Sequence, residues 1–255
     1  MTAYFAATDV DPHEADGSDN WSSRPVLVGR TAERATLDAA MAAARGGHRT
    51  AVLVHGSPGF GKTALVNDLL DRTRPARLWR ATAETDETSI PYGVLGQLLR
   101  GAGGELPPRL SKIAEGTDVD ADPLAIGLDL LSVLDKFGGA SEGGKSGVAD
   151  AGDEPLTLVV DDIQWADPLS LRSLVFALRR LVEVSVLTVL ICRRAALSSL
   201  PASLRRLVAD IAVRIEMRPL DPADVRTLAD ALGQPRLAAR TARRIVEHSG
   251  GSPLY

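Results

Sequence analysis

Eight consecutive residues, 56–63, constrain this chain more than any other segment. They read Gly-Ser-Pro-Gly-Phe-Gly-Lys-Thr and match the pattern G-x-x-x-x-G-K-[ST] in full. An apolar run at 51–55 precedes them and a helical pattern at 63–71 follows, which is the strand-loop-helix setting that the pattern requires. In that setting, glycines turn successive backbone N–H groups inward, and the start of the helix points at the same anion. The segment therefore predicts a phosphate cradle.

The side chains of this cradle indicate a nucleotide and a metal ion. Lys62 is placed to reach the β- and γ-phosphates, and the hydroxyl of Thr63 is a ligand for Mg²⁺. We therefore expect ATP or ADP, with Mg²⁺, as the ligands. The nucleotide-binding residues expected in this segment are Gly56, Ser57, Pro58, Gly59, Phe60, Gly61, Lys62, Thr63 and Ala64.

A pair of acids about 100 residues further on is the expected magnesium side of the site. The apolar run at 156–160 is followed by Asp161 and Asp162. An aspartate at this position holds Mg²⁺, usually through water, because Mg²⁺ retains several of its waters. We assign this role to Asp161, together with Thr63, and expect Asp162 to polarise the attacking water. Two aspartates can also simply end a strand, but the spacing from the phosphate cradle favours the functional interpretation.

Arg193 is the third expected catalytic residue, beside Asp162 and Lys62. It follows the apolar strand pattern at 186–191. A polar group at that strand end would lie next to the γ-phosphate. The alternative is an arginine that only solvates the strand end, and the sequence does not decide whether Arg193 or its neighbour Arg194 points inward.

The alternation of strands and helices predicts an α/β fold: a P-loop nucleotide-binding domain with a parallel sheet flanked by helices, and a short helical segment at the C-terminal end. Strands are expected at 51–55, 77–82, 156–160, 186–191 and 213–217. Helices are expected at 63–71, 91–99, 123–134, 169–182, 200–208, 222–232 and 237–248, after a first helix that Thr31 caps and Gly46 ends.

The chain divides into three expected parts. Residues 1–24 are polar and acidic without periodicity and predict a disordered tail. Residues 25–218 form the nucleotide-binding domain, and the Gly- and Ser-rich stretch 138–155 within it predicts a flexible loop. Residues 219–255 form the C-terminal helical segment.

Composition excludes several classes of protein. The formal net charge is -4, which gives no general case for nucleic-acid binding, although residues 193–255 carry eleven Arg against six Asp and Glu. These arginines are expected to solvate helix faces, or else to face phosphates or a partner domain. The single cysteine, Cys192, forms no intrachain disulfide and is expected in the core. With no signal peptide and no apolar stretch of membrane length, a cytoplasmic protein without membrane contact is expected.

Four segments together resemble a known family. They are residues 26–34 (Val-Leu-Val-Gly-Arg-Thr-Ala-Glu-Arg), 161–168 (Asp-Asp-Ile-Gln-Trp-Ala-Asp-Pro), 250–255 (Gly-Gly-Ser-Pro-Leu-Tyr) and 90–99 (Ile-Pro-Tyr-Gly-Val-Leu-Gly-Gln-Leu-Leu). Their order resembles the N-terminal STAND-type, AAA-like ATPase module of the large ATP-binding LuxR-type (LAL) transcription regulators of actinobacteria. The resemblance covers about residues 25–255. Position 164 departs from it, because Gln stands where the family often has His.

The resemblance implies a slow regulatory ATPase. Val28, Gly29 and Arg30 would lie near the adenine and ribose, and Pro253 would pack near the adenine from the other side. The nucleotide state would control self-association, and thereby a DNA-binding helix-turn-helix that lies outside this chain. The chain is accordingly expected to be a fragment or an expressed domain.

Three functions remain in view. A regulatory nucleotide switch that hydrolyses ATP slowly is favoured. The main alternative is an AAA-type ATPase module coupled to another effector, such as a cyclase, a kinase or a DNA-loading machine. A module in which ATP is only structural is less favoured, because Asp162 would have little use there.

Overall fold

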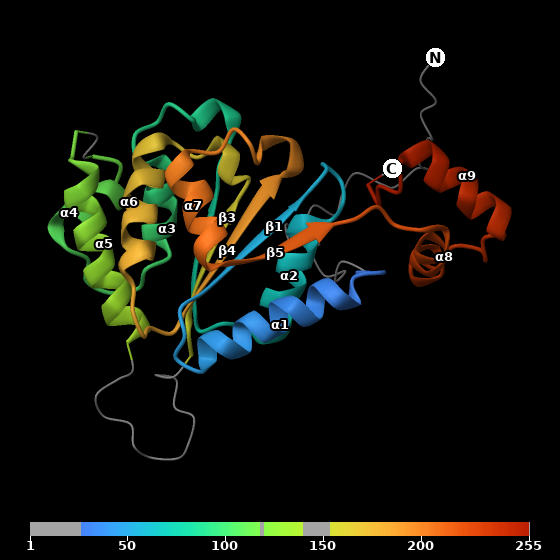
Figure 1. Ribbon diagram of the computed structural model, residues 1–255, viewed down its shortest axis with the longest axis horizontal. Coiled ribbons are helices and arrows are strands. Elements are labelled where there is room, and N and C mark those ends of the chain that lie inside the picture. The colour runs from blue at the N-terminus through green and yellow to red at the C-terminus, as the bar shows by residue number, and fades with distance from the viewer. Residues whose placement is uncertain (1–26, 118–119, 140–153, 255) are drawn as a thin grey trace, which may run out of the picture.

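Five parallel strands form one sheet with the order β2-β3-β4-β1-β5 (Figure 1). The structure, a computed structural model, describes residues 27–117, 120–139 and 154–254. The strands are β1 (Thr50–Gly56), β2 (Arg77–Thr82), β3 (Leu156–Asp161), β4 (Val186–Arg193) and β5 (Ala212–Met217). Within these residues, no helix is long and apolar enough to cross a membrane.

Of the helices, one precedes the first strand, others connect successive strands, and two follow the last strand. They are α1 (Thr31–Arg45), α2 (Lys62–Thr73), α3 (Gly93–Arg100), α4 (Pro108–Ala114), α5 (Pro123–Gly138), α6 (Pro168–Arg180), α7 (Ala202–Ile211), α8 (Pro222–Ala231) and α9 (Ala239–Ser249). The last two pack on each other beyond the end of β5, apart from the helices that cover the sheet (Figure 1).

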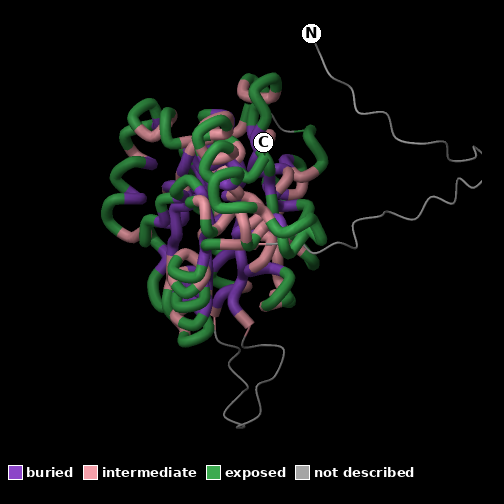
Figure 2. The backbone as a smooth tube through the Cα atoms, turned by 90° about the vertical axis from the view of Figure 1, so that its right-hand side faces the viewer, coloured by how far each residue is buried: buried purple, intermediate pink, exposed green. Residues whose placement is uncertain are grey.

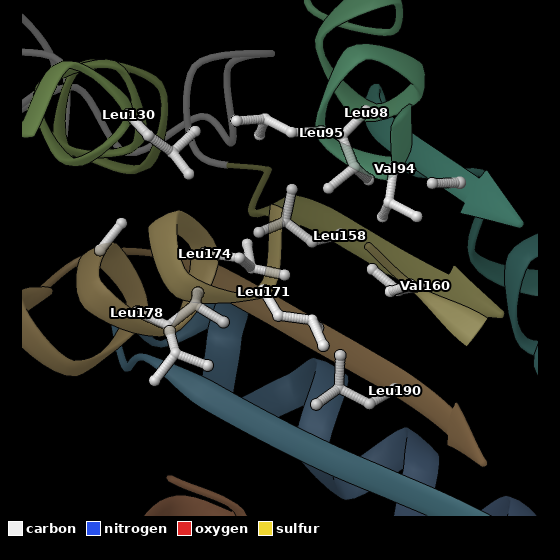
Figure 3. Close-up of a cluster of buried hydrophobic side chains, with 14 of the residues drawn as sticks. Val94, Leu95, Leu98, Leu130, Leu158, Val160, Leu171, Leu174, Leu178 and Leu190 are labelled. Atoms are coloured by element: carbon white, nitrogen blue, oxygen red, sulfur yellow. The ribbon is translucent and has the colours of Figure 1, made fainter. Parts of the chain in front are cut away.

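Successive strand residues point to opposite faces of the sheet, and the three central strands β3, β4 and β1 are buried along most of their length, so both faces are covered there. On β1, Val52 and Val54 join one core with α1 and α2, while Leu53 joins the other core with α3 to α7. Buried backbone accordingly gathers at the centre of the molecule (Figure 2). In the larger core, leucines of α3, α5 and α6 meet β3 and β4 (Figure 3). Packing on both faces therefore fixes the positions of the strand ends and of the residues that follow them.

The predicted α/β fold with a parallel sheet flanked by helices is confirmed. The predicted cap of the first helix is wrong: Arg30 is the N-cap, and Thr31 is the first helical residue, without a side-chain cap bond. Helix α4 was not expected, because its seven residues are too short for a clear period. The predicted tail 1–24 and most of the predicted loop 138–155 (residues 140–153) lie outside the described residues.

Asp167, in the segment that follows the acid pair, joins the start of α3 to the start of α6. Its carboxylate is almost fully buried and caps α6 by accepting the N–H of Ser170 at 2.8 Å. It also accepts the N–H groups of Tyr92 at 3.0 Å and Val94 at 3.2 Å. Three orphan donors at the starts of α3 and α6 are thus satisfied by one side chain.

We predict that Asp167→Ala lowers the free energy of unfolding by about 3 kcal/mol, because buried N–H groups lose their acceptor. Chemical denaturation would measure it. Asp122→Ala is the matched control: Asp122 caps α5 at the surface through two contacts of 3.4 Å, so its loss should cost at most about 1 kcal/mol. Equal losses in both variants would contradict the joining role of Asp167.

Candidate nucleotide-binding site

The carboxyl ends of β1, β3 and β4 meet at one edge of the sheet. The register pairs Gly56 at the end of β1 with Arg193 on β4, and Thr82 on β2 with Asp161 on β3. Ligands of open α/β sheets bind in the crevice beyond such strand ends. The residues that the sequence singled out on separate strands are therefore brought together here.

The loop at residues 56–63, here called the phosphate loop, joins β1 to α2 and contains two glycines with positive φ. Gly59 and Gly61 adopt the left-handed conformation, with φ of 78° and 82°, which glycine allows without strain. Helix α2 begins directly afterwards at Lys62. The Lys62 side chain is 8% exposed, and its Nζ donates to the carbonyl of Ser57 at 3.0 Å. Burial lowers the pKa of Lys62, while Asp162 and Asp161 oppose that shift.

Thr63 and Asp161 form the pair expected to hold Mg²⁺. The Thr63 hydroxyl donates to Asp161 Oδ2 at 2.8 Å, and Asp161 is only 6% exposed. Two hard oxygen donors next to the phosphate cradle suit Mg²⁺, which keeps several waters and takes few protein ligands. No group of three or more His, Cys, Asp or Glu in the described part of the chain could hold a metal ion, so phosphates and water would supply the other ligands.

Asp162 is held by two side chains. Gln164 Nε2 donates to its Oδ1 at 2.6 Å, and Arg193 Nε contacts the same oxygen at 3.4 Å. Gln164 Oε1 in turn accepts the backbone N–H of Arg193 at 3.1 Å, so Gln164 bridges β3 and β4. Asp162 also has a left-handed backbone, with φ of 48°, which is uncommon outside glycine and gathers at functional sites.

The structure separates the two neighbouring arginines. Arg193 lies on the side of Asp162, and its guanidinium carbon is 5.8 Å from the ring centroid of Trp165. Arg194 is more exposed and pairs instead with Glu216 on β5. Of the two arginines, Arg193 is thus the one in contact with the acid pair. Its strand neighbour Cys192 is fully buried, as expected, and burial raises the pKa of the thiol to about 11.

Arg30 ties the segment before α1 to the phosphate loop. It is almost fully buried, and its Nη2 donates to the carbonyls of Phe60 at 3.2 Å and Arg218 at 2.7 Å. Gly29 is exposed, and a Cβ there would lie 2.5 Å from the carboxylate of Asp224 on α8. Val28 is half-buried. Gly29 and Arg30 thus lie between the phosphate loop and α8.

Ser252 is a contact residue that the sequence did not single out. Its hydroxyl donates to the carbonyl of Gly59 at 3.2 Å, and a Cβ on Gly59 would lie 2.5 Å from that same hydroxyl oxygen. The neighbouring Pro253, expected near the adenine, is exposed. The signal for Ser252 was its place inside the Gly-Gly-Ser-Pro segment, whereas its partner, 193 residues away, could only be found from the fold.

Comparison with known proteins gives the class of this chain. Residues 26–192 match the AAA ATPase domain family, and the chain belongs to that family. Membership implies binding of ATP or ADP and ATPase activity. A search of curated proteins finds no match.

Solved structures of similar fold include ORC and Cdc6 proteins. The chain is similar to the Aeropyrum pernix ORC1 protein in complex with DNA, with a TM-score of 0.55 and 18% identity over 84% of this chain and 52% of that one. It is similar to Cdc6p from Pyrobaculum aerophilum, at 0.52 and 17% over 81% and 50%. It is also similar to Drosophila ORC bound to DNA, at 0.55 and 13% over 97% and 60%. At these identities the likeness shows the fold alone, and the chain spans about half the length of the two archaeal proteins.

We predict that Lys62→Ala weakens ATP binding at least about tenfold, because a buried charge facing the phosphate cradle is lost. Titration calorimetry with Mg²⁺ present would measure it. Lys112→Ala, on the exposed surface of α4, is the charge-matched control and should leave the affinity unchanged. Unchanged affinity in both variants would remove Lys62 from the site.

Proposed function

We propose that this domain is a regulatory nucleotide switch, which binds ATP or ADP with Mg²⁺ and hydrolyses ATP slowly. The observation that carries the proposal is the hydrogen bond from Ser252 of the C-terminal segment to Gly59 of the phosphate loop. Beside it, Arg30 joins Phe60 of the phosphate loop to Arg218, which directly precedes that segment. A change in the conformation of the phosphate loop would therefore move Ser252, after α9, and Arg218, before α8. That coupling is what a switch requires.

The proposed roles follow the positions of the side chains. Lys62 contacts the β- and γ-phosphates, Thr63 and Asp161 hold Mg²⁺, Asp162 polarises water, and Arg193 faces the γ-phosphate. Residues 28–30 and Pro253 flank the adenine and ribose. We further propose the division into a tail at 1–24, a nucleotide-binding domain at 25–218 and a C-terminal helical segment at 219–255 that reports the nucleotide state.

Slow turnover is consistent with the way Asp162 is held. Its Oδ1 already accepts a hydrogen bond from Gln164 and faces the charge of Arg193. Both contacts restrain the carboxylate and engage an oxygen that would otherwise be free to bind the attacking water. An acid restrained in this way suits a regulatory ATPase with slow hydrolysis better than an enzyme of high turnover.

We propose more specifically that this chain is the N-terminal ATPase module of a LuxR-type (LAL) transcription regulator. Support comes from the order of the four segments around 26–34, 90–99, 161–168 and 250–255. The module would self-associate in the ATP state, and DNA would be bound through a region outside this chain.

The second candidate is an AAA module of a DNA-loading machine. The fold likeness to ORC and Cdc6 proteins, two of them solved with DNA, favours it. The arginines at 240, 243 and 244 on α9 are exposed and could face phosphates. Duplex binding by this chain that weakens steeply with salt would support that candidate, because phosphate contacts release counterions.

We predict that Asp162→Asn keeps ATP bound while the hydrolysis rate falls at least about 100-fold, because the group that polarises water is lost. Asn tolerates the left-handed backbone at this position, so the fold should survive. Phosphate release would be measured beside Asp230→Asn on the exposed surface of α8, which should hydrolyse like the parent. Equal rates in all three proteins would exclude Asp162 from the reaction.

We predict that Ser252→Ala lowers ADP affinity about fivefold, because one hydrogen bond between the C-terminal segment and the phosphate loop is removed. Hydrogen exchange at residues 250–254 should rise at the same time and no longer respond to nucleotide. Ser249→Ala is the matched control, since among the described residues the Ser249 hydroxyl bonds only within its own turn, where it accepts the N–H of Gly251. If exchange in the parent ignores nucleotide, the switch is refuted.

A further inference from the structure

A second pocket lies beside the phosphate loop, on the face of the sheet that α7 covers. Its volume is about 300 Å³, at the lower end for small-molecule sites. Leu53 and His55 of β1 line one side, Arg205 and Val208 of α7 another, and Arg214 of β5 the open edge of the sheet. None of these side chains has a part in the nucleotide site described above.

The walls of this pocket have mixed chemistry. Leu53, Val208 and Leu197 supply apolar surface, while Arg205 and Arg214 supply two positive charges. Among the described residues, neither arginine makes an ion pair or a side-chain hydrogen bond, whereas nearby Arg194 is neutralised by Glu216. The planar forks of two unpaired arginines suit a carboxylate or a phosphate group.

His55 adds an unsatisfied polar group to the same pocket. Its Nδ1 is buried, and no partner for it occurs in the described part of the chain. Burial lowers the pKa of His55, and Arg194 and Arg214 lower it further, against the opposing effect of Glu216. The ring is therefore neutral at pH 7 and can exchange a hydrogen bond with a ligand. A buried polar atom without a partner normally calls for one.

We infer that this pocket binds a small organic anion with an apolar body. Its carboxylate or phosphate group lies against Arg205 and Arg214, its apolar part against Leu53 and Val208, and a polar atom of it satisfies His55. His55 is followed by Gly56, where a Cβ would lie only 2.8 Å from Met217 on β5. Because β1 and β5 are so close there, a ligand in the pocket shifts Gly56, the first residue of the phosphate loop. The affinity for nucleotide then changes.

The experiment uses the whole chain, free of nucleotide, titrated by calorimetry with 4-phenylbutyrate and with phenyl phosphate. Their neutral and non-aromatic counterparts, 4-phenylbutyramide and inorganic phosphate, are titrated beside them. We expect at least one of the two aromatic anions to bind, and the amide and inorganic phosphate to bind at least about tenfold more weakly. The better of the two anions identifies the headgroup that the pocket prefers.

Arg205→Leu and Arg214→Leu should each weaken that anion about tenfold. Arg206→Leu is the control, because Arg206 is also exposed on α7 but lies outside the pocket and contacts the carbonyl of Ala202. Arg205→Gln and Arg214→Gln, with unfolding followed by circular dichroism, separate a lost contact from a lost fold. Absence of binding by both aromatic anions, equal binding of the amide, or equal loss in the Arg206 variant would overturn the inference.

The link to nucleotide is measured separately. Saturating probe should change the affinity of a fluorescent ADP analogue, and ADP should change the affinity of the probe by the same factor. A pocket that binds the anion without this coupling overturns the regulatory part of the inference. A chain that binds the anion but no nucleotide overturns the proposed function instead and leaves the pocket in place.

Discussion

The parallel pairing of β3, β4 and β1 is the constraint on which the rest of the structure depends. It is fixed by apolar side chains on both faces, because a strand that slipped by one residue would move its side chains from one core into the other. With that register fixed, Gly56 at the end of β1 lies beside Arg193 at the end of β4. The acid pair lies at the end of β3, the next strand on the other side of β4. Thr63 and Asp161 can then meet at hydrogen-bond distance although 98 residues separate them.

Most of the fold could be predicted from local sequence because its signals are local. All five strands were predicted, and those at 51–55, 156–160 and 186–191 were predicted from continuous apolar runs of strand length. Helix α4 was missed because it is short, and the cap of α1 was assigned to Thr31 because the side-chain chemistry fits, although the bond is not made. In both places tertiary packing, which a single sequence does not display, decides the outcome.

The site was predictable where function fixes spacing and not where it depends on contact across the fold. The eight-residue loop and the acid pair have recognisable patterns. Gln164 was noted only as a departure from the resembling family, yet it holds Asp162 and the β4 backbone together. Ser252 and the choice of Arg193 over Arg194 rest on distances between segments far apart in the chain. The contact between the phosphate loop and the C-terminal segment could therefore be found only from the structure.

Identification of the nucleotide that co-purifies with the chain tests the account most directly. The protein would be purified without added nucleotide and denatured, and the supernatant analysed by chromatography. Because Arg30 and Ser252 hold the phosphate loop, the chain is predicted to retain ADP or ATP, approaching about one molecule per chain, and Lys62→Ala to lose it. A chain that carries no nucleotide, and takes up neither ADP nor ATP when Mg²⁺ is supplied, would contradict the account.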